Sequence, residues 1–228
     1  MDIVVIPARS GSKRIKNKNI KKFCGRPIIY WIIRKIKRSN LFDKVIVTSD
    51  SYRILNISKK FGADILIKRN KKLSDDFTPT IPVINHSILS LSNLKINNVC
   101  CIYPCNPFLN ILDIKKAFLL AKKNKFVLPV TKFASHPQKA FKIDKNSNIQ
   151  TFFKINFSKR NQDIEDLYHD AGQFYFGNKN LWLNTKRNMF ENSIGIKIPS
   201  WRVIDIDNID DWKRAEKIFF TFRKFFLK

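Results

Sequence analysis

Short apolar runs alternate with amphipathic segments over the first 130 residues of the chain. The runs are bounded by polar residues, which is typical of strands buried on both faces of a sheet. The strands predicted in this way are residues 3–6, 45–48, 65–67, 99–103 and 126–130. The segments between them predict a helix that begins near residue 27 and helices over residues 52–61, 81–92 and 113–123. This alternation predicts a Rossmann-like α/β fold, in which helices cover both faces of a mostly parallel sheet.

The segment after residue 27 illustrates the helical pattern. Pro27 suits the first position of a helix, because that position needs no backbone N–H. The isoleucines that follow recur at spacings that place them on one helix face, at Ile28, Ile29, Ile32, Ile33 and Ile36. A helix with one apolar face is expected to pack against the sheet.

The alternation of strands and helices breaks after residue 131. Residues 132–171 are rich in Asn, Lys and Ser and contain short patches that resemble a hairpin, so they are expected to form an excursion, either a β-arm or a flap. Further along, residues 173–176 and 195–198 are predicted strands. Residues 210–226 form a predicted amphipathic helix with Asn208 near its N-cap. We therefore expect a single domain over residues 1–228, from which the excursion departs.

A basic loop of small residues follows the first predicted strand, with the sequence Pro-Ala-Arg-Ser-Gly-Ser-Lys-Arg-Ile-Lys-Asn-Lys-Asn over residues 7–19. Ligands of open α/β sheets bind at the carboxyl ends of the strands, and small residues let backbone N–H groups approach a phosphate. The spacing excludes both the GxxxxGK[ST] and the GxGxxG motif. Five cations in one loop fit a nucleotide triphosphate, although a solvated basic turn remains an alternative. These cations are Arg9, Lys13, Arg14, Lys16 and Lys18.

The charge of the chain suggests a second possible function. Lys and Arg number 44 against 18 Asp and Glu, which gives a formal net charge of +26. Such a charge is typical of proteins that bind nucleic acid or anionic membranes, and a basic nucleic-acid-binding protein is therefore the alternative from another class. The cations are scattered through every segment, however, so we expect nonspecific polyanion binding at low salt and no specific nucleic-acid partner.

The apolar stretches and the cysteines bear on location. No stretch approaches 18 apolar residues, so neither a secretory signal nor a membrane-spanning helix is expected, and a cytoplasmic location is the default. The four cysteines lack the spacing of a zinc site with the three histidines. We expect them to be reduced and mostly buried thiols.

Two acidic sites stand out. Asp205 and Asp207 flank one apolar residue, so both carboxylates point to the same face of an extended segment, as a Mg²⁺ site that also takes phosphate oxygens requires. A capping or surface pair is the alternative. Asp50 follows the second predicted strand and is expected to cap the next helix, with a contact to ribose or to a second metal as alternatives.

The basic loop closely resembles the opening of the cytidylyltransferases that activate nonulosonic acids, the nine-carbon acid sugars related to sialic acid. Residues 47–51, 73–78 and 204–207 resemble further segments of that family in the same order. Residues 167–175 are most similar to the branch that acts on pseudaminic acid. The family pattern Ala-Arg-x-x-Ser-Lys-x-x-x-x-Lys-Asn is matched at Ala8, Arg9, Ser12, Lys13, Lys18 and Asn19.

The resemblance implies a fold of the nucleotide-diphospho-sugar transferase type and transfer of CMP from CTP to pseudaminic acid, with Mg²⁺ as cofactor and release of pyrophosphate. Cytidylyl transfer to N-acetylneuraminic or legionaminic acid is the alternative within the family. The implied nucleotide-binding residues are Arg9, Ser12, Lys13, Lys18, Asn19, Arg69 and Thr78. The implied metal ligands are Asp205 and Asp207, which together with Lys18 form the implied catalytic set.

The sugar site is expected to be shared between two subunits. The resemblance implies a homodimer in which the 132–171 excursion helps to close the partner's sugar site. The implied sugar-binding residues are Tyr103, Asn106, Arg160, Gln162 and Gln173. Arg160 suits the carboxylate of the acid, because its planar guanidinium can donate two parallel hydrogen bonds. Tyr103 departs from the sialic acid enzymes, which carry Gln at that place, and this supports a different acid. His169 has no assigned role: a histidine followed by Asp more often makes a structural hydrogen bond, and acid–base catalysis is the alternative.

Overall fold

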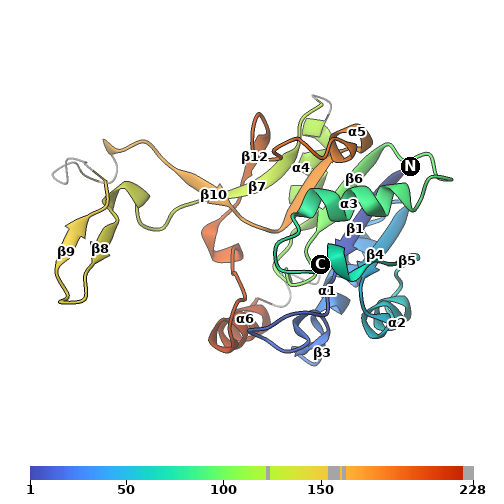
Figure 1. The fold of residues 1–228 in the computed structure, drawn as a ribbon, viewed down its shortest axis with the longest axis horizontal. Coiled ribbons are helices and arrows are strands. Elements are labelled where there is room, and N and C mark those ends of the chain that lie inside the picture. Colours follow the sequence, from blue (N-terminus) through green and yellow to red (C-terminus); the bar gives the residue numbers. More distant parts are fainter. Residues whose placement is uncertain (122–123, 154–159, 161–162, 223–228) are drawn as a thin grey trace.

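An eight-stranded sheet forms the centre of the computed structural model, which describes residues 1–121, 124–153, 160 and 163–222 (Figure 1). In its first half β1 (Asp2–Pro7) lies between β4 (Lys44–Ser49) and β6 (Asn98–Ile102), and β5 (Ile65–Lys68) lies beyond β4. All of these pairs are parallel. The predicted parallel pairing of strands is thus confirmed for this half of the sheet.

The second half of the sheet mixes strand directions. The strand β11 (Phe174–Asn178) runs antiparallel to β6 and to β7 (Val127–Lys132). The short strand β10 (Tyr168–Asp170) is also antiparallel to β7, whereas β12 (Ile194–Lys197) pairs with β7 in parallel. The sheet is therefore mostly parallel, as predicted, with β10 and β11 inserted in the opposite direction. The sequence analysis missed β10, which is only three residues long.

Side chains of β1 alternate between the two faces of the sheet and join two different clusters of the core. Val4 and Ile6 pack in the cluster that includes side chains of α1, α2 and α4. Ile3 and Val5 pack in the cluster that includes side chains of α3 and α5. Full burial of each such side chain stabilises the fold by roughly 1.5–3 kcal/mol. These helices are α1 (Ile28–Ser39), α2 (Tyr52–Lys60), α3 (Thr80–Leu89), α4 (Ile111–Leu120) and α5 (Lys179–Leu183).

The last helix, α6 (Ile209–Thr221), lies beside a small hairpin rather than on the sheet (Figure 1). The side chain of Asn208 accepts hydrogen bonds from the first turn, and Asp211 completes the capping box, so the predicted cap is confirmed. Trp212 and Phe219 of α6 pack against Phe23 in a third core cluster. The hairpin consists of β2 (Lys22–Phe23) and β3 (Arg26–Pro27). Residues 223–226 of the predicted helix lie outside the described residues.

The excursion forms an arm that projects away from the body of the molecule (Figure 1). Its outer part is an antiparallel hairpin of β8 (Phe141–Ile143) and β9 (Ile149–Thr151), preceded by the short helix η4 (Pro137–Lys139). Of the two forms expected for this segment, the β-arm is the one that the structure has. Large apolar side chains are exposed along it, at Phe141, Ile143, Ile149, Phe152 and Phe153.

All four cysteines are reduced thiols, two of them buried in β6 and two half-buried, as predicted. Among the helices of the described residues, none has the length and hydropathy required to cross a bilayer.

Candidate functional site

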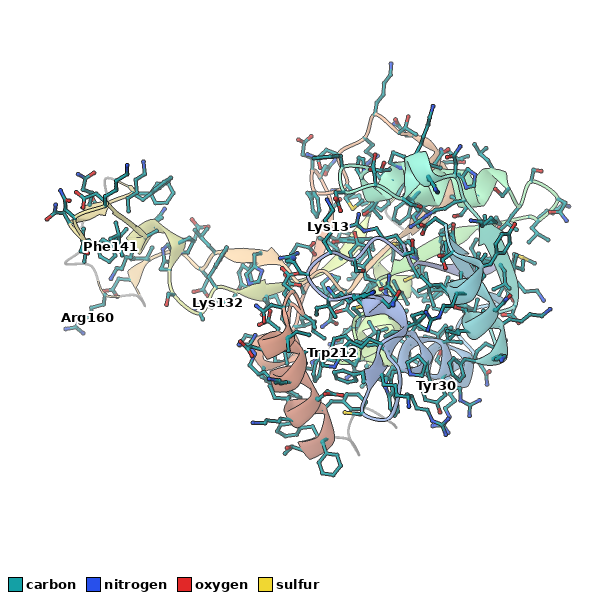
Figure 2. All side chains as sticks on the ribbon, turned by 60° about the horizontal axis from the view of Figure 1, so that its bottom comes forward. Lys13, Tyr30, Lys132, Phe141, Arg160 and Trp212 are labelled. Atoms are coloured by element: carbon teal, nitrogen blue, oxygen red, sulfur yellow. The ribbon has the colours of Figure 1, made fainter. Side chains whose placement is uncertain are left out.

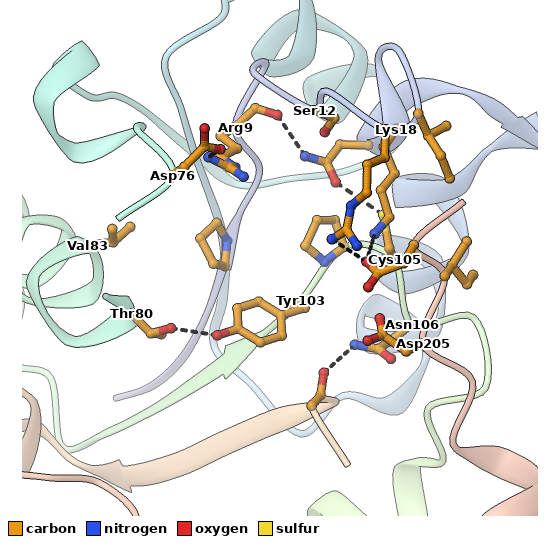
Figure 3. A pocket seen from close by; sticks show the side chains of 18 of the residues that line it. Arg9, Ser12, Lys18, Asp76, Thr80, Val83, Tyr103, Cys105, Asn106 and Asp205 are labelled. Carbon is orange, nitrogen blue, oxygen red and sulfur yellow. Dashed lines mark hydrogen bonds and ion pairs between the residues drawn. The ribbon is translucent and has the colours of Figure 1, made fainter. Parts of the chain in front are cut away.

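A cavity of about 670 Å³ opens at the carboxyl ends of the parallel strands (Figure 3). Pro7 at the end of β1, Arg69 after β5 and Tyr103 after β6 all line it. The basic loop forms one wall, and residues 203–207 close the site near Lys18. This is the place where open α/β sheets bind their ligands, so the structure brings together the segments that the sequence analysis selected.

Asp50 fixes the basic loop to the end of β4. Its carboxylate accepts hydrogen bonds from the backbone N–H of Ser10, at 2.8 Å, and from the Ser10 hydroxyl. Burial opposes ionisation, but these hydrogen bonds together with a further backbone hydrogen bond and the positive charge of Arg69 lower the pKa of Asp50 below its ordinary value. The expectation that Asp50 caps the next helix is wrong: Ser51 holds the N-cap position of α2 and makes no capping hydrogen bond among the described residues. Ser10, forty residues away, offers Asp50 two donors instead.

A second set of contacts holds the far end of the loop. The side-chain amide of Asn19 donates to the carbonyl of Arg9 at 2.8 Å, and the Cys105 thiol donates to the amide oxygen of Asn19 at 3.2 Å. Burial raises the pKa of Cys105 to about 12, which keeps the thiol protonated as this hydrogen bond requires. Asn19 therefore closes the loop on itself and connects it to the loop after β6.

Two carboxylates neutralise cations of the loop. Asp76 bridges Arg9 and Lys13, with N–O distances of 2.7 and 2.6 Å. The hydrogen bonds from Lys13 and Arg9 lower the pKa of Asp76. Phosphate oxygens that enter the cavity would compete with this carboxylate. Four of the five cations picked from the sequence line the cavity, and Lys16 is not among the described residues that do.

Asp207 makes the second bridge, on the opposite side of the loop. Its Oδ1 lies 2.8 Å from the guanidinium of Arg14 and 3.9 Å from the ammonium of Lys18. Asp205 also lines the cavity, and burial together with the negative charge of Asp207 raises its pKa. The two carboxylates thus face one cavity, as the spacing predicts.

The two acids suit a hard cation that has other ligands as well. A cation between them would relieve the repulsion that raises the pKa of Asp205. No group of three or more His, Cys, Asp or Glu side chains that could enclose a metal occurs among the described residues. Mg²⁺ commonly binds through one or two carboxylates and completes its shell with water and substrate phosphates. The donor set therefore fits Mg²⁺.

Arg69 lies under the cavity with an exposed fraction of only 5%. Its Nε donates to the Ser74 hydroxyl at 2.7 Å, while its Nη1 is buried and has no hydrogen-bond partner among the described residues. Burial lowers the pKa of this guanidinium. Thr78 also lines the cavity, with its hydroxyl donating to the carbonyl of Lys72. Ser12, the remaining predicted nucleotide-side residue, lines the same wall.

Hydroxyl groups line the opposite end of the cavity. The Tyr103 hydroxyl lies 2.5 Å from that of Thr80, and burial raises its pKa to about 12 (Figure 3). Next to it, the Tyr175 hydroxyl donates to Asp170. Asn106 holds the carbonyl of Gly172 at 2.8 Å. Tyr103 and Asn106 were expected here, whereas Tyr175 and Asp170 were given no role, although both belong to the 167–175 segment that resembles the pseudaminic acid branch.

Gln173 was expected to bind sugar, and this is wrong for the cavity of this chain: Gln173 does not line it and is 1% exposed. The preceding Gly172 adopts a left-handed conformation with φ of 60°, so the chain turns directly before Gln173. The Gln173 amide donates to the carbonyl of Arg202 at 2.8 Å.

Arg160 lies on the arm, far from Lys13 in Figure 2, and does not line this chain's cavity. Gln162 lies outside the described residues. His169 lines the cavity, and its Nδ1 lies 2.9 Å from the carbonyl of Asp170. Its ring also packs on Phe133. A structural contact thus accounts for one of its two nitrogens.

Comparison with known proteins connects this cavity to one kind of chemistry. A sequence model of the family described as cytidylyltransferase matches residues 3–226. The chain is 35% identical over 222 residues to the pseudaminic acid cytidylyltransferase of Campylobacter jejuni, a match that covers 96% of each protein. It is 30% identical over 216 residues to an N-acylneuraminate cytidylyltransferase of Escherichia coli, covering 93% of this chain and 51% of that protein.

Solved structures share the fold at much lower sequence identity. The structure of a CMP:2-keto-3-deoxy-manno-octonic acid synthetase complexed with CTP superposes with a TM-score of 0.72 at 13% identity, covering 96% of this chain and 98% of that one. A 4-diphosphocytidyl-2C-methyl-D-erythritol synthase from Anaerococcus prevotii gives a TM-score of 0.60 at 18% identity, covering 95% and 96%. The predicted fold class is confirmed.

Proposed function

We propose that this chain, which belongs to the cytidylyltransferase family, transfers CMP from CTP to the anomeric hydroxyl of pseudaminic acid and releases pyrophosphate. The family membership makes it a nucleotidyltransferase. The observation that carries the proposal is one cavity in which a cation-rich loop faces two carboxylates, within a chain that matches a pseudaminic acid cytidylyltransferase over 96% of both lengths. A further relative of the same name, from another strain of Campylobacter jejuni, is 34% identical over 222 residues.

The reaction depends mainly on alignment and on neutralising phosphate charge. Arg9, Lys13 and Lys18 would bind the triphosphate, with Ser12 and Asn19 shaping the loop around it. Arg69 and Thr78 lie deeper along the same wall, where the nucleoside would bind. The anomeric hydroxyl attacks the α-phosphate, and pyrophosphate leaves, so no covalent intermediate with the enzyme is needed.

Asp205 and Asp207 would hold Mg²⁺, which supplies charge neutralisation on the phosphates and lowers the pKa of a bound hydroxyl. Lys18 is the cation nearest to this pair that is mostly sheltered from solvent, with an exposed side-chain fraction of 22%. It is therefore placed to stabilise negative charge that develops on the α-phosphate.

The sugar would bind at the hydroxyl-lined end, next to Tyr103 and Asn106. Its carboxylate would be held by Arg160 of the partner subunit in a homodimer. The arm supports this arrangement, because it carries exposed apolar side chains that association would remove from water. Sedimentation of the wild type and of a Phe141→Ser, Ile149→Ser variant tests it: a dimer that dissociates in the variant is expected, and a wild-type monomer would refute it.

The choice of acid rests on relatedness and on Tyr103. The N-acylneuraminate and legionaminic acid enzymes are also relatives, at 30% and 26% identity, so their acids are the second candidates. We place the reaction in the cytoplasm, where CTP is available. Incubation with CTP, Mg²⁺ and each acid, followed by pyrophosphate release, tests the proposal. Release with pseudaminic acid is expected, and no release with any nonulosonic acid would overturn it.

A further inference from the structure

A buried ion pair lies behind the wall of the cavity. Nη1 of Arg202 is 2.6 Å from Oδ2 of Asp113, and both side chains are 6% exposed. Arg202 ends the short helix η6 (Ser200–Arg202), three residues before Asp205. Asp113 lies in the first turn of α4, a helix whose Ile114 is fully buried. The ion pair therefore connects the segment of the cavity acids to a fixed element of the core.

The backbone of Arg202 is held independently of its side chain. Its carbonyl accepts the hydrogen bond from Gln173, which is itself 1% exposed. The other side-chain atom of Gln173, Oε1, is buried and finds no hydrogen-bond partner within the described part of the chain. Among the described residues, the Gln173 side chain therefore makes its hydrogen bond to the carbonyl of Arg202.

The far end of the same segment is fixed as well. Asp211 accepts hydrogen bonds from the backbone N–H groups of Asp207 and Asn208, each at 3.1 Å. Residues 203–207 thus form a short bridge between two anchored ends, and both cavity carboxylates lie on it. A bridge of this length moves little unless one of its ends is released.

Stability alone does not explain the buried charges. An apolar pair of similar volume commonly stabilises a protein as well as a buried ion pair does, because desolvation offsets the attraction between the charges. An ion pair does impose a defined geometry. Lys35 lies near this pair: it donates to the carbonyls of Pro107 and Leu109, directly after the cavity-lining residues 104–106, and its pKa is lowered by burial and by the charge of Arg202.

We propose that Arg202, held by Asp113 and Gln173, is a positioning residue that fixes the 203–207 segment and so sets the placement of Asp205 and Asp207. Its consequence for metal use rests on the function proposed above, whereas the anchoring itself does not.

The test uses Gln173→Leu in the whole protein. Substitution of Arg202 alone would leave Asp113 buried without a partner, which can prevent folding. Gln173→Leu keeps the volume and removes one hydrogen bond. The matched control is Thr131→Val, which removes a hydrogen bond of the same kind, from a buried hydroxyl to the carbonyl of Ile198 at 3.0 Å. The double variant Asp113→Asn, Arg202→Gln removes both buried charges together.

Two readouts separate positioning from general loosening. Amide hydrogen exchange in residues 203–207 should become roughly 5- to 10-fold faster in Gln173→Leu and in the double variant, since a hydrogen bond is lost at one end of the bridge. The Mg²⁺ concentration for half-maximal CMP transfer should rise several-fold, with the KM for CTP at saturating Mg²⁺ unchanged. Thr131→Val should alter neither.

Unchanged exchange, an unchanged Mg²⁺ requirement, or equal effects in Thr131→Val would each overturn the proposal. A wild-type protein that transfers no CMP would refute the proposed function instead. The exchange comparison then still decides whether Gln173 and Arg202 anchor the segment.

Discussion

Substitution of Lys18 by alanine should impair the use of CTP far more than the same change at Lys13, although both belong to the basic loop. The Lys18 side chain is 22% exposed, whereas that of Lys13 is 80% exposed. A charge-assisted contact of a sheltered group contributes roughly 1.5–3 kcal/mol. Its loss lowers kcat/KM for CTP by about 10- to 150-fold. Solvent screens the contact of Lys13, so its loss should lower kcat/KM by less than about fivefold.

Pyrophosphate release as a function of CTP concentration measures these effects, at saturating Mg²⁺ and acid. Lys16→Ala is the matched control, because Lys16 belongs to the same loop but is not among the described residues that line the cavity. Its kcat/KM should stay within twofold of the wild type. All three variants should unfold at the wild-type temperature, since none of these side chains is part of the buried core.

Two results would refute this reasoning. An equal loss in Lys16→Ala and Lys18→Ala would mean that the loop acts only through its total charge. A larger loss in Lys13→Ala than in Lys18→Ala would mean that solvent exposure in this structure does not rank the phosphate contacts.

Three further predictions address the metal, the acid and the buried lysine. Asp207→Asn should lower activity and raise the Mg²⁺ requirement, because it removes a hard anionic ligand at almost unchanged size; wild-type activity that survives a chelator would contradict this. Pseudaminic acid should be turned over at least about tenfold faster than N-acetylneuraminic acid in a direct comparison of rates, since buried polar groups matched to one acid penalise another, and equal rates would reassign the substrate. Burial, together with the charge of Arg202, lowers the pKa of Lys35 to about 7. Between about pH 7 and 10, Lys35 is protonated in the unfolded chain but has lost its proton in the folded protein. Raising the pH therefore favours the folded state. The unfolding equilibrium constant of the wild type, relative to that of Lys35→Met, should fall by up to roughly tenfold per pH unit over this range. Chemical denaturation across this range measures the effect, and a flat difference would contradict the lowered pKa of Lys35.

The parallel half of the sheet could be predicted because its signals are local. Each strand there is an apolar run whose neighbours along the chain form helices with one apolar face, and a parallel sheet covered on both sides is the arrangement that buries them all. β10 escaped prediction because three residues carry no periodicity. The helix α5 escaped for a related reason, since five residues complete little more than one turn.

The roles of single polar residues could not be predicted where they depend on contacts with residues distant in the sequence. Asp50 satisfies the local pattern of a helix cap, yet Ser10 offers it two donors from forty residues away. Gln173 lies two residues before Tyr175, which does line the cavity, and simple alternation would place both on one side. In the structure Gln173 is instead buried and donates to the carbonyl of Arg202, and the sequence does not indicate this contact between residues 29 positions apart.

The two ends of the cavity differ in how far apart in the sequence their residues lie. The triphosphate side is built largely from one continuous loop, so its residues are adjacent in the sequence and their shared charge marks them as a site. The acid-sugar side combines the end of β6, the β10–β11 turn and, in the proposed dimer, the arm of a second subunit. No local sequence pattern indicates which hydroxyl groups at this end contact each other. Family membership and cytidylyl transfer therefore follow from the loop, whereas the identity of the acid depends on contacts such as that between Tyr103 and Thr80, which only folding brings together.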